Sequence, residues 1–214
     1  MIEKTNPLRL ETVAILLSLT FIIPALQWLV GLFVQPAALS GLIGSLLVIL
    51  PLLWWALRTQ KMVLLPRSRL WSWVAYLVGL LVLITLAINI HNRPVQKMTG
   101  LPRPPLEVIN TILFTPLAEE LVFRGLMWSF FATLFTDKDT DLGVLLGTSL
   151  LFGVEHLGYW AQTNWPLPPF AYLHASSMVA AGLVFGTLRQ RSGSLAAPTL
   201  LHMLANGLIL FFQS

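Results

Sequence analysis

Ionisable and amide side chains interrupt the apolar segments in the second half of this 214-residue chain at regular spacings. The candidates for chemistry are Glu119, Glu120, Arg124, Phe152, His156, His202 and Asn206. An ionisable group inside an apolar helix is costly unless it is paired or hydrated, so each one is a candidate for function. A carboxylate can act as a general base, and an amide N–H can stabilise an oxyanion.

The two adjacent glutamates are expected to differ in role. Neighbours on a helix diverge by about 100°, whereas residues four apart share a face. Glu120 and Arg124 are four apart, and we expect them to form a buried ion pair that holds the segment in shape. Glu119 then has no local partner. It is either the general base or a carboxylate satisfied by a distant donor.

The other candidates also occur as pairs with a spacing of four. His156 shares a helical face with Phe152, and Asn206 shares one with His202. Asparagine is a poor metal ligand and a good oxyanion donor. Glu155 points about 100° away from its neighbour His156, so we expect it to point toward a helix end or loop, in a structural or peripheral role.

Smaller signals accompany these clusters. His174 has no partner that the sequence assigns, and we expect an interfacial or packing role for it. Pro116 and Pro198 precede two of the clusters, and each removes a backbone hydrogen bond and can kink its helix beside a cavity. Two glycine pairs, 143/147 and 182/186, predict close approach of neighbouring helices.

Composition identifies a membrane protein. Hydrophobic residues make up 56% and charged residues 10%, with a mean hydropathy of +0.78, whereas soluble domains carry about 25% charged residues. A soluble enzyme, a disordered chain and a nucleic-acid-binding domain are excluded. The net charge of +4 is attributed to Lys and Arg in cytoplasmic loops. Without cysteine there is neither a disulfide nor a thiolate metal site.

Apolar runs predict an all-α, polytopic helical bundle with a catalytic cavity between the later helices. A bilayer core about 30 Å thick requires roughly 20 helical residues. The expected spans are 12–34, 36–57, 70–90, 106–136, 142–156, 170–188 and 195–212. An eighth would result if 106–116 formed a separate re-entrant or interfacial helix. Residues 1–105 contain helices without diagnostic motifs and 106–214 contain the candidates, within one integrated membrane domain.

Positive charge predicts the orientation. Nine Lys and Arg residues fall on the side of the N-terminus and three on the other side, with Arg124 inside the bundle. The excess places the N-terminus in the cytoplasm. We expect a multi-pass protein of the plasma membrane.

Residues 106–212 resemble the CPBP family of intramembrane proteases, the CAAX-processing and bacteriocin-processing enzymes also called Abi proteins. Three stretches in order are similar to the family's EExxxR, FxxxH and HxxxN motifs. They are Glu119-Glu120-Leu-Val-Phe-Arg124, Phe152-Gly-Val-Glu-His156 and His202-Met-Leu-Ala-Asn206. Each motif alone is weak, but three on successive apolar segments are fairly specific.

The resemblance implies an endopeptidase that hydrolyses a peptide bond in a membrane-associated protein or peptide. It implies that Glu119 and His156 activate water and that His202 and Asn206 stabilise the oxyanion. It also implies the metalloprotease label, in which Glu119, His156 and His202 would be the ligands of a Zn²⁺ ion. In the metal-free alternative Glu119 is the base and His156 orients the water.

Two other classes of function stay open from the sequence. A catalytically inactive scaffold, immunity or regulatory protein could keep the same fold, and a small transporter or proton channel could use intramembrane Glu and His as a relay. The expected partners are the lipid bilayer and a protein or peptide substrate, with no nucleic acid. Prenylated CAAX proteins and bacteriocin precursors are both candidate substrates.

Overall fold

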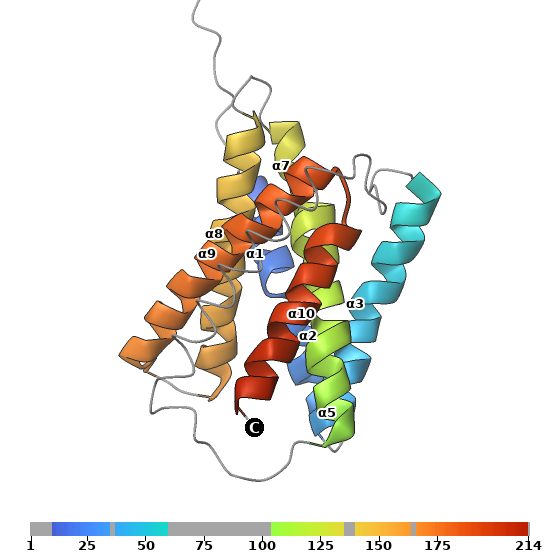
Figure 1. The fold of residues 1–214 in the computed structure, drawn as a ribbon, viewed down its shortest axis with the longest axis vertical. Coiled ribbons are helices and arrows are strands. Elements are labelled where there is room, and N and C mark those ends of the chain that lie inside the picture. The colour runs from blue at the N-terminus through green and yellow to red at the C-terminus, as the bar shows by residue number, and fades with distance from the viewer. Residues whose placement is uncertain (1–9, 35–36, 60–103, 135–139, 164–165, 214) are drawn as a thin grey trace, which may run out of the picture.

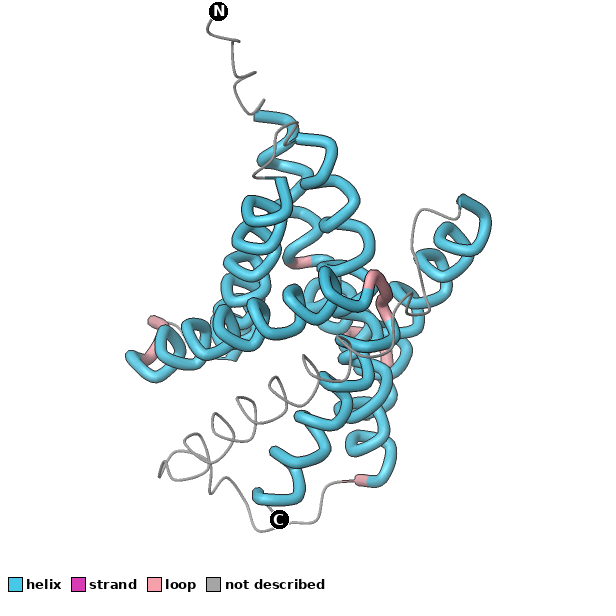
Figure 2. Tube along the Cα trace, turned by 45° about the horizontal axis from the view of Figure 1, so that its top comes forward, coloured by secondary structure: helices cyan, strands magenta, loops and turns pink. Residues whose placement is uncertain are grey.

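The computed structural model describes residues 10–34, 37–59, 104–134, 140–163 and 166–213, and within these ranges every regular element is a helix (Figures 1 and 2). This confirms the all-α fold class for the described residues. The first three helices are α1 (Leu10–Thr20), α2 (Ile22–Gly31) and α3 (Ala37–Thr59). The later ones are α5 (Pro105–Ile109), η2 (Asn110–Phe114), α6 (Thr115–Glu120), η3 (Leu121–Met127), α7 (Trp128–Leu134), α8 (Thr140–Thr163), α9 (Pro169–Ser192) and α10 (Ala196–Gln213).

The helices support an integral membrane protein, but the count of seven spans is not confirmed. Three described helices are long and apolar enough to cross a bilayer, namely the segments Leu39–Arg58, Asp141–Ala161 and Pro169–Ser192. A bent pair, Ala14–Thr20 and Ile22–Gly31, would add a fourth, while the apolar helix Ala196–Phe211 is shorter. The expected span 70–90 lies outside the described residues. The membrane that holds the protein and its orientation stay predictions.

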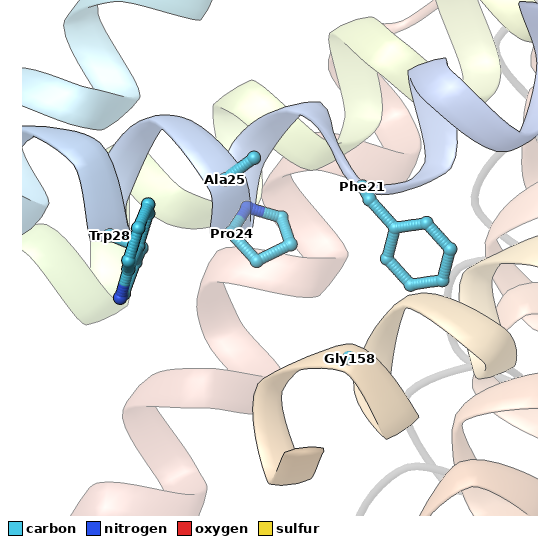
Figure 3. A pocket seen from close by; sticks show the side chains of 5 residues that line it. All are labelled: Phe21, Pro24, Ala25, Trp28 and Gly158. Carbon is cyan, nitrogen blue, oxygen red and sulfur yellow. The ribbon is translucent and has the colours of Figure 1, made fainter. Parts of the chain in front are cut away.

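The first expected span, residues 12–34, contains two helices that form a bent pair. Its two helices meet at Phe21 with a bend of 52°. Pro24 lies in the first turn of α2, where its ring excludes a backbone donor and crowds the carbonyl four residues earlier. Figure 3 shows the shallow apolar hollow at this break, with the Phe21 ring against Gly158 of α8. None of its lining residues is a candidate for catalysis.

Residues 105–134 form consecutive helical elements without a break, so residues 106–116 are not a separate helix within the described structure. The path is irregular because η2 and η3 are π-helical, with backbone bonds from residue i to residue i−5 in place of i−4. Such wide turns often occur at functional sites. Here they flank α6, which carries Glu119 and Glu120.

Helices α8 and α9 pack side by side along their lengths (Figure 1). Gly182 makes this possible, since a Cβ there would lie 3.0 Å from the Ser149 Cα and 3.2 Å from Nη2 of Arg124. The expected close approach through the second glycine pair is therefore present. Helix α9 ends at Gly193, whose φ of 65° is the left-handed conformation that favours glycine.

Candidate active site

Helix α10 brings His202 against the two adjacent glutamates of α6. The Nδ1 of His202 lies 3.0 Å from Oε1 of Glu120, and its Nε2 lies 3.6 Å from Oε2 of Glu119. All three side chains are buried. A carboxylate oxygen only accepts, so Nδ1–H donates to Glu120. The glutamates thus diverge as expected, but they meet opposite edges of one imidazole ring.

Arg124 fixes Glu120 from the other side. Its Nη1 lies 3.4 Å from Oε1 of Glu120, and both side chains have no exposed area. Its Nη2 donates to the carbonyl of Gly182 on α9 at 2.9 Å. The expected ion pair is therefore present, and the same guanidinium ties η3 to α9. The guanidinium thus forms an ion pair with Glu120 on one side and donates a charge-assisted hydrogen bond to a backbone carbonyl on the other.

Aromatic rings pack against these charges. The guanidinium carbon of Arg124 lies 4.6 Å from the ring centre of Phe152 and 5.5 Å from that of Phe185, distances typical of cation–π contacts. Phe185 also stacks on the His202 ring at 4.5 Å. Phe152 is fully buried and meets the edge of His202 at 5.8 Å. The two phenylalanines hold the imidazole plane between the glutamates.

His156 approaches the same cluster from α8. Its ring centre lies 4.8 Å from that of Phe152, and its Nδ1 lies 2.8 Å from the Phe152 carbonyl. Because a carbonyl only accepts, Nδ1 carries the proton, and a neutral ring then has its lone pair on Nε2. The spacing of four thus places the Phe152 carbonyl where Nδ1–H of His156 can donate to it. Nε2 is then the nitrogen that is free to accept a proton.

Asn206 lies one turn beyond His202 on α10 and is half-buried. Its Nδ2 donates to the carbonyl of Thr111 in η2 at 3.0 Å. One N–H of the amide is thereby used, and the second is free for another acceptor.

Glu155 corrects an expectation. The sequence suggested a structural or peripheral carboxylate pointing toward a helix end or loop, but Glu155 is fully buried inside α8. In the part of the chain that the structure describes, neither of its oxygens has a hydrogen-bond partner. The carboxylate lies within electrostatic range of Glu119, Arg124 and Glu120. Its position inside an apolar run was the available signal, and the angle to His156 was given too much weight.

His174 packs against other rings, as expected of a packing residue, and stacks on Phe170. The indole Nε1–H of Trp160 donates to its Nδ1 at 3.1 Å, and its ring centre lies 5.4 Å from that of His156. An accepting Nδ1 makes the ring neutral, with the proton on Nε2. No sequence spacing links α8 and α9 at this point, so this contact was not predictable.

Most of the candidates are therefore neighbours. Glu119, Glu120, Arg124 and His202 contact one another directly or through one side chain, and Phe152 touches both histidines. Asn206 and His156 flank this cluster from α10 and α8. That Glu119, His156, His202 and Asn206 surround one water and one scissile carbonyl stays a prediction.

The donor set does not fit zinc in the described part of the chain. A catalytic zinc site usually has three protein ligands, and no three His, Asp or Glu side chains gather there in a group that could hold a metal. Glu119 and His202 supply two. His156 contacts the ring of Phe152, which also contacts His202.

Part of the chain is similar to known proteins. An uncharacterized 24.3 kDa protein of Escherichia coli is 34% identical over 113 residues, which are 53% of this chain and 46% of that relative. The chain thus aligns with about half the length of the curated relative that it matches. No solved structure matches. The family model described as "Type II CAAX prenyl endopeptidase Rce1-like" matches residues 101–208, a range that includes every candidate residue. Because that range is half of the chain, the protein belongs to the Rce1-like family of type II CAAX prenyl endopeptidases.

Proposed function

We propose that the protein is an intramembrane endopeptidase that cleaves a prenylated CAAX-type protein or peptide. Family membership supports the class of reaction and substrate. The site supports a mechanism in which Glu119 is the general base, His156 orients the water, and His202 and Asn206 bind the oxyanion. Glu120 and Arg124 hold the motif in place.

The different surroundings of the two glutamates carry this proposal. Glu120 has Arg124 and the Nδ1–H of His202 within reach, so its charge is committed to structure. Among the described residues, Glu119 approaches the Nε2 of His202 at 3.6 Å, which is beyond hydrogen-bond distance. A buried carboxylate with an unmade hydrogen bond is suited to accept a proton from water.

The donors complete the reaction. Glu119 takes a proton from water, and the hydroxide attacks the scissile carbonyl, so that its oxygen becomes the oxyanion. The free N–H of Asn206 and the Nε2–H of a protonated His202 can donate to that oxygen. When the C–N bond breaks, the proton held by Glu119 passes to the leaving amine. The lone pair on Nε2 of His156 suits it to accept a hydrogen bond from the attacking water.

We also propose that this chemistry proceeds without zinc. The proposal is based on the donor set, since Glu119, His156 and His202 do not form a group that could hold a metal among the described residues. Elemental analysis of the purified active protein tests it. We expect full activity with under about a tenth of a zinc ion per chain, unaffected by chelators. Loss of activity on chelation and recovery with Zn²⁺ would contradict the proposal.

The direct test is cleavage of a fluorogenic farnesylated CAAX peptide by the purified protein in lipid vesicles. We expect wild-type turnover and a loss of at least about a hundredfold in Glu119→Gln. The same peptide without the farnesyl group tests the substrate class. Arg191→Met is the matched control, because Arg191 is exposed at the end of α9.

The alternatives predict other outcomes of the same assay. A scaffold would show no turnover and would tolerate loss of Glu119. A transporter or proton channel would show proton flux across the vesicle membrane that depends on Glu119 and His156, without cleavage. Either result would overturn the endopeptidase.

A further inference from the structure

The carbonyl of Thr111 has lost its backbone partner, and the sequence explains why. In η2 the N–H of Thr115 donates to the carbonyl of Asn110, which is the π-helical register. The next donor in that register is residue 116, which would reach the carbonyl of Thr111. Residue 116 is proline and has no N–H. Thr111 is half-buried, and a carbonyl shielded from water without a donor is costly, so a partner from elsewhere is favoured.

Pro116 also accounts for the wide turn itself. In a regular α-helix the proline ring collides with the carbonyl four residues earlier, here that of Ile112. The π register moves this carbonyl away from the ring, and π turns relieve such conflicts within helices. Pro116 is buried in the first turn of α6, directly after η2. One residue thus both widens the helix and removes the donor.

Asn206, 95 positions further along the chain, donates the missing hydrogen bond to the Thr111 carbonyl. Its Nδ2 lies 3.0 Å from the Thr111 carbonyl. Only the NH₂ end of an amide can face a carbonyl, so this contact decides which way the amide is turned. The second N–H and Oδ1 of Asn206 then have fixed directions.

We propose that Pro116 is a positioning residue for Asn206. By leaving the carbonyl of Thr111 without a backbone donor, it creates the acceptor that fixes the amide orientation and holds the second N–H ready for the oxyanion. The catalytic consequence rests on the proposed function. The coupling between Pro116 and Asn206 does not, because it is a property of the fold.

A double-mutant cycle on thermal stability tests the coupling. Asn206→Leu keeps the size of the side chain but removes the donor. In the wild-type background it should lower the melting temperature by about 2–4 °C, because the Thr111 carbonyl becomes unsatisfied. In Pro116→Ala a backbone N–H is restored and can serve this carbonyl. Asn206→Leu should then lower the melting temperature by less than about half as much.

Two further variants keep the test decisive. Pro116→Val restores the N–H with a larger side chain and replaces Pro116→Ala if the alanine variant does not fold. Pro51→Ala is the matched control, since Pro51 is an exposed proline inside α3. Its effect on the melting temperature should add to that of Asn206→Leu. If the effects of Pro116→Ala and Asn206→Leu are also additive, the proposal is overturned, whatever the activity.

Kinetics with the farnesylated peptide test the catalytic consequence. Pro116→Ala should lower kcat by about tenfold to a hundredfold with little change in KM, because the amide is free to turn. In the Asn206→Leu background it should lower kcat no further. An equal loss in both backgrounds would contradict positioning through Asn206. Coupled melting temperatures without cleavage by the wild-type protein would support the positioning and overturn the proposed endopeptidase.

Discussion

Two buried carboxylates of this bundle differ in the partners that surround them. Glu120, at the end of α6, meets Arg124 at 3.4 Å and His202 at 3.0 Å. Glu155, on α8, is equally buried, yet among the described residues neither of its oxygens has a hydrogen-bond partner. The α6 region therefore pairs the charge that it buries, although Oε2 of Glu120 has no hydrogen-bond partner among these residues, whereas the α8 region leaves its carboxylate unpaired there.

The difference predicts that Glu120 contributes to the stability of the fold, whereas the burial of Glu155 lowers it. Removing one member of a satisfied pair leaves a buried charge alone and is expensive. Removing a carboxylate that has no partner takes away a cost of burial. We therefore expect substitutions in the two regions to change stability in opposite directions, although the residues are equally buried.

The largest effect is expected from Arg124→Met. It removes the partner of Glu120 and the donor to Gly182 at 2.9 Å, and it leaves Glu120 dependent on His202 alone. We expect a loss of about 3–5 kcal/mol, enough to prevent recovery of folded protein in detergent. Yield and melting temperature measure it. Arg191→Met, at an exposed arginine of the same bundle, should change neither.

The adjacent glutamates give the next contrast. Glu120→Gln weakens the pairing with Arg124 and should destabilise by about 3 kcal/mol. Glu119→Gln loses only the 3.6 Å approach to His202 and should stay within about 1 kcal/mol of wild type while it loses turnover. Melting temperature and peptide cleavage are measured on the same preparations. Equal stability with equal loss of activity would contradict this division of roles.

The sequence predicted the elements near the site better than their contacts. Helices α9 and α10 and the pairing of Glu120 with Arg124 follow from apolar runs and from a spacing of four, which are local properties. The bend at Phe21 and the π turn before Pro116 were not predicted in form, although a proline lies beside each. A proline in the sequence indicates that a helix is irregular, but it does not show whether the helix bends or adopts a π-helical register.

Contacts between helices were largely beyond the sequence. Three contacts depend on how α8, α9 and α10 pack. His202 lies between both glutamates, Trp160 donates to His174, and Asn206 donates to a backbone carbonyl. Side-chain type shows that each polar group needs a partner. It does not show which of several distant groups provides it, because many helix arrangements satisfy the same spacings.

Glu155→Gln tests the region without partners. The amide keeps the shape of the side chain and cannot ionise close to Glu119 and Glu120. We expect the melting temperature to stay the same or to rise, by up to about 4 °C. The matched comparison is Glu120→Gln, the same change at an equally buried position, which should lower it. A fall of similar size in both variants would show that Glu155 has a structural partner.

The smallest effect is expected where α8 meets α9. Trp160→Phe keeps an aromatic ring beside Phe170 but removes the indole N–H that donates to Nδ1 of His174 at 3.1 Å. One neutral hydrogen bond is lost, so stability should fall by about 1 kcal/mol. Without that donor the Nδ1 of His174 is free to carry the proton, and ¹⁵N NMR of the histidine rings should show a mixture of tautomers where the wild type has the Nε2–H form. His156 provides the internal control, because its Nδ1–H donates to the Phe152 carbonyl and its tautomer should not change. If His174 kept the Nε2–H tautomer in Trp160→Phe, the tautomer would be set by the packing of the ring against Phe170 and not by the hydrogen bond from the indole.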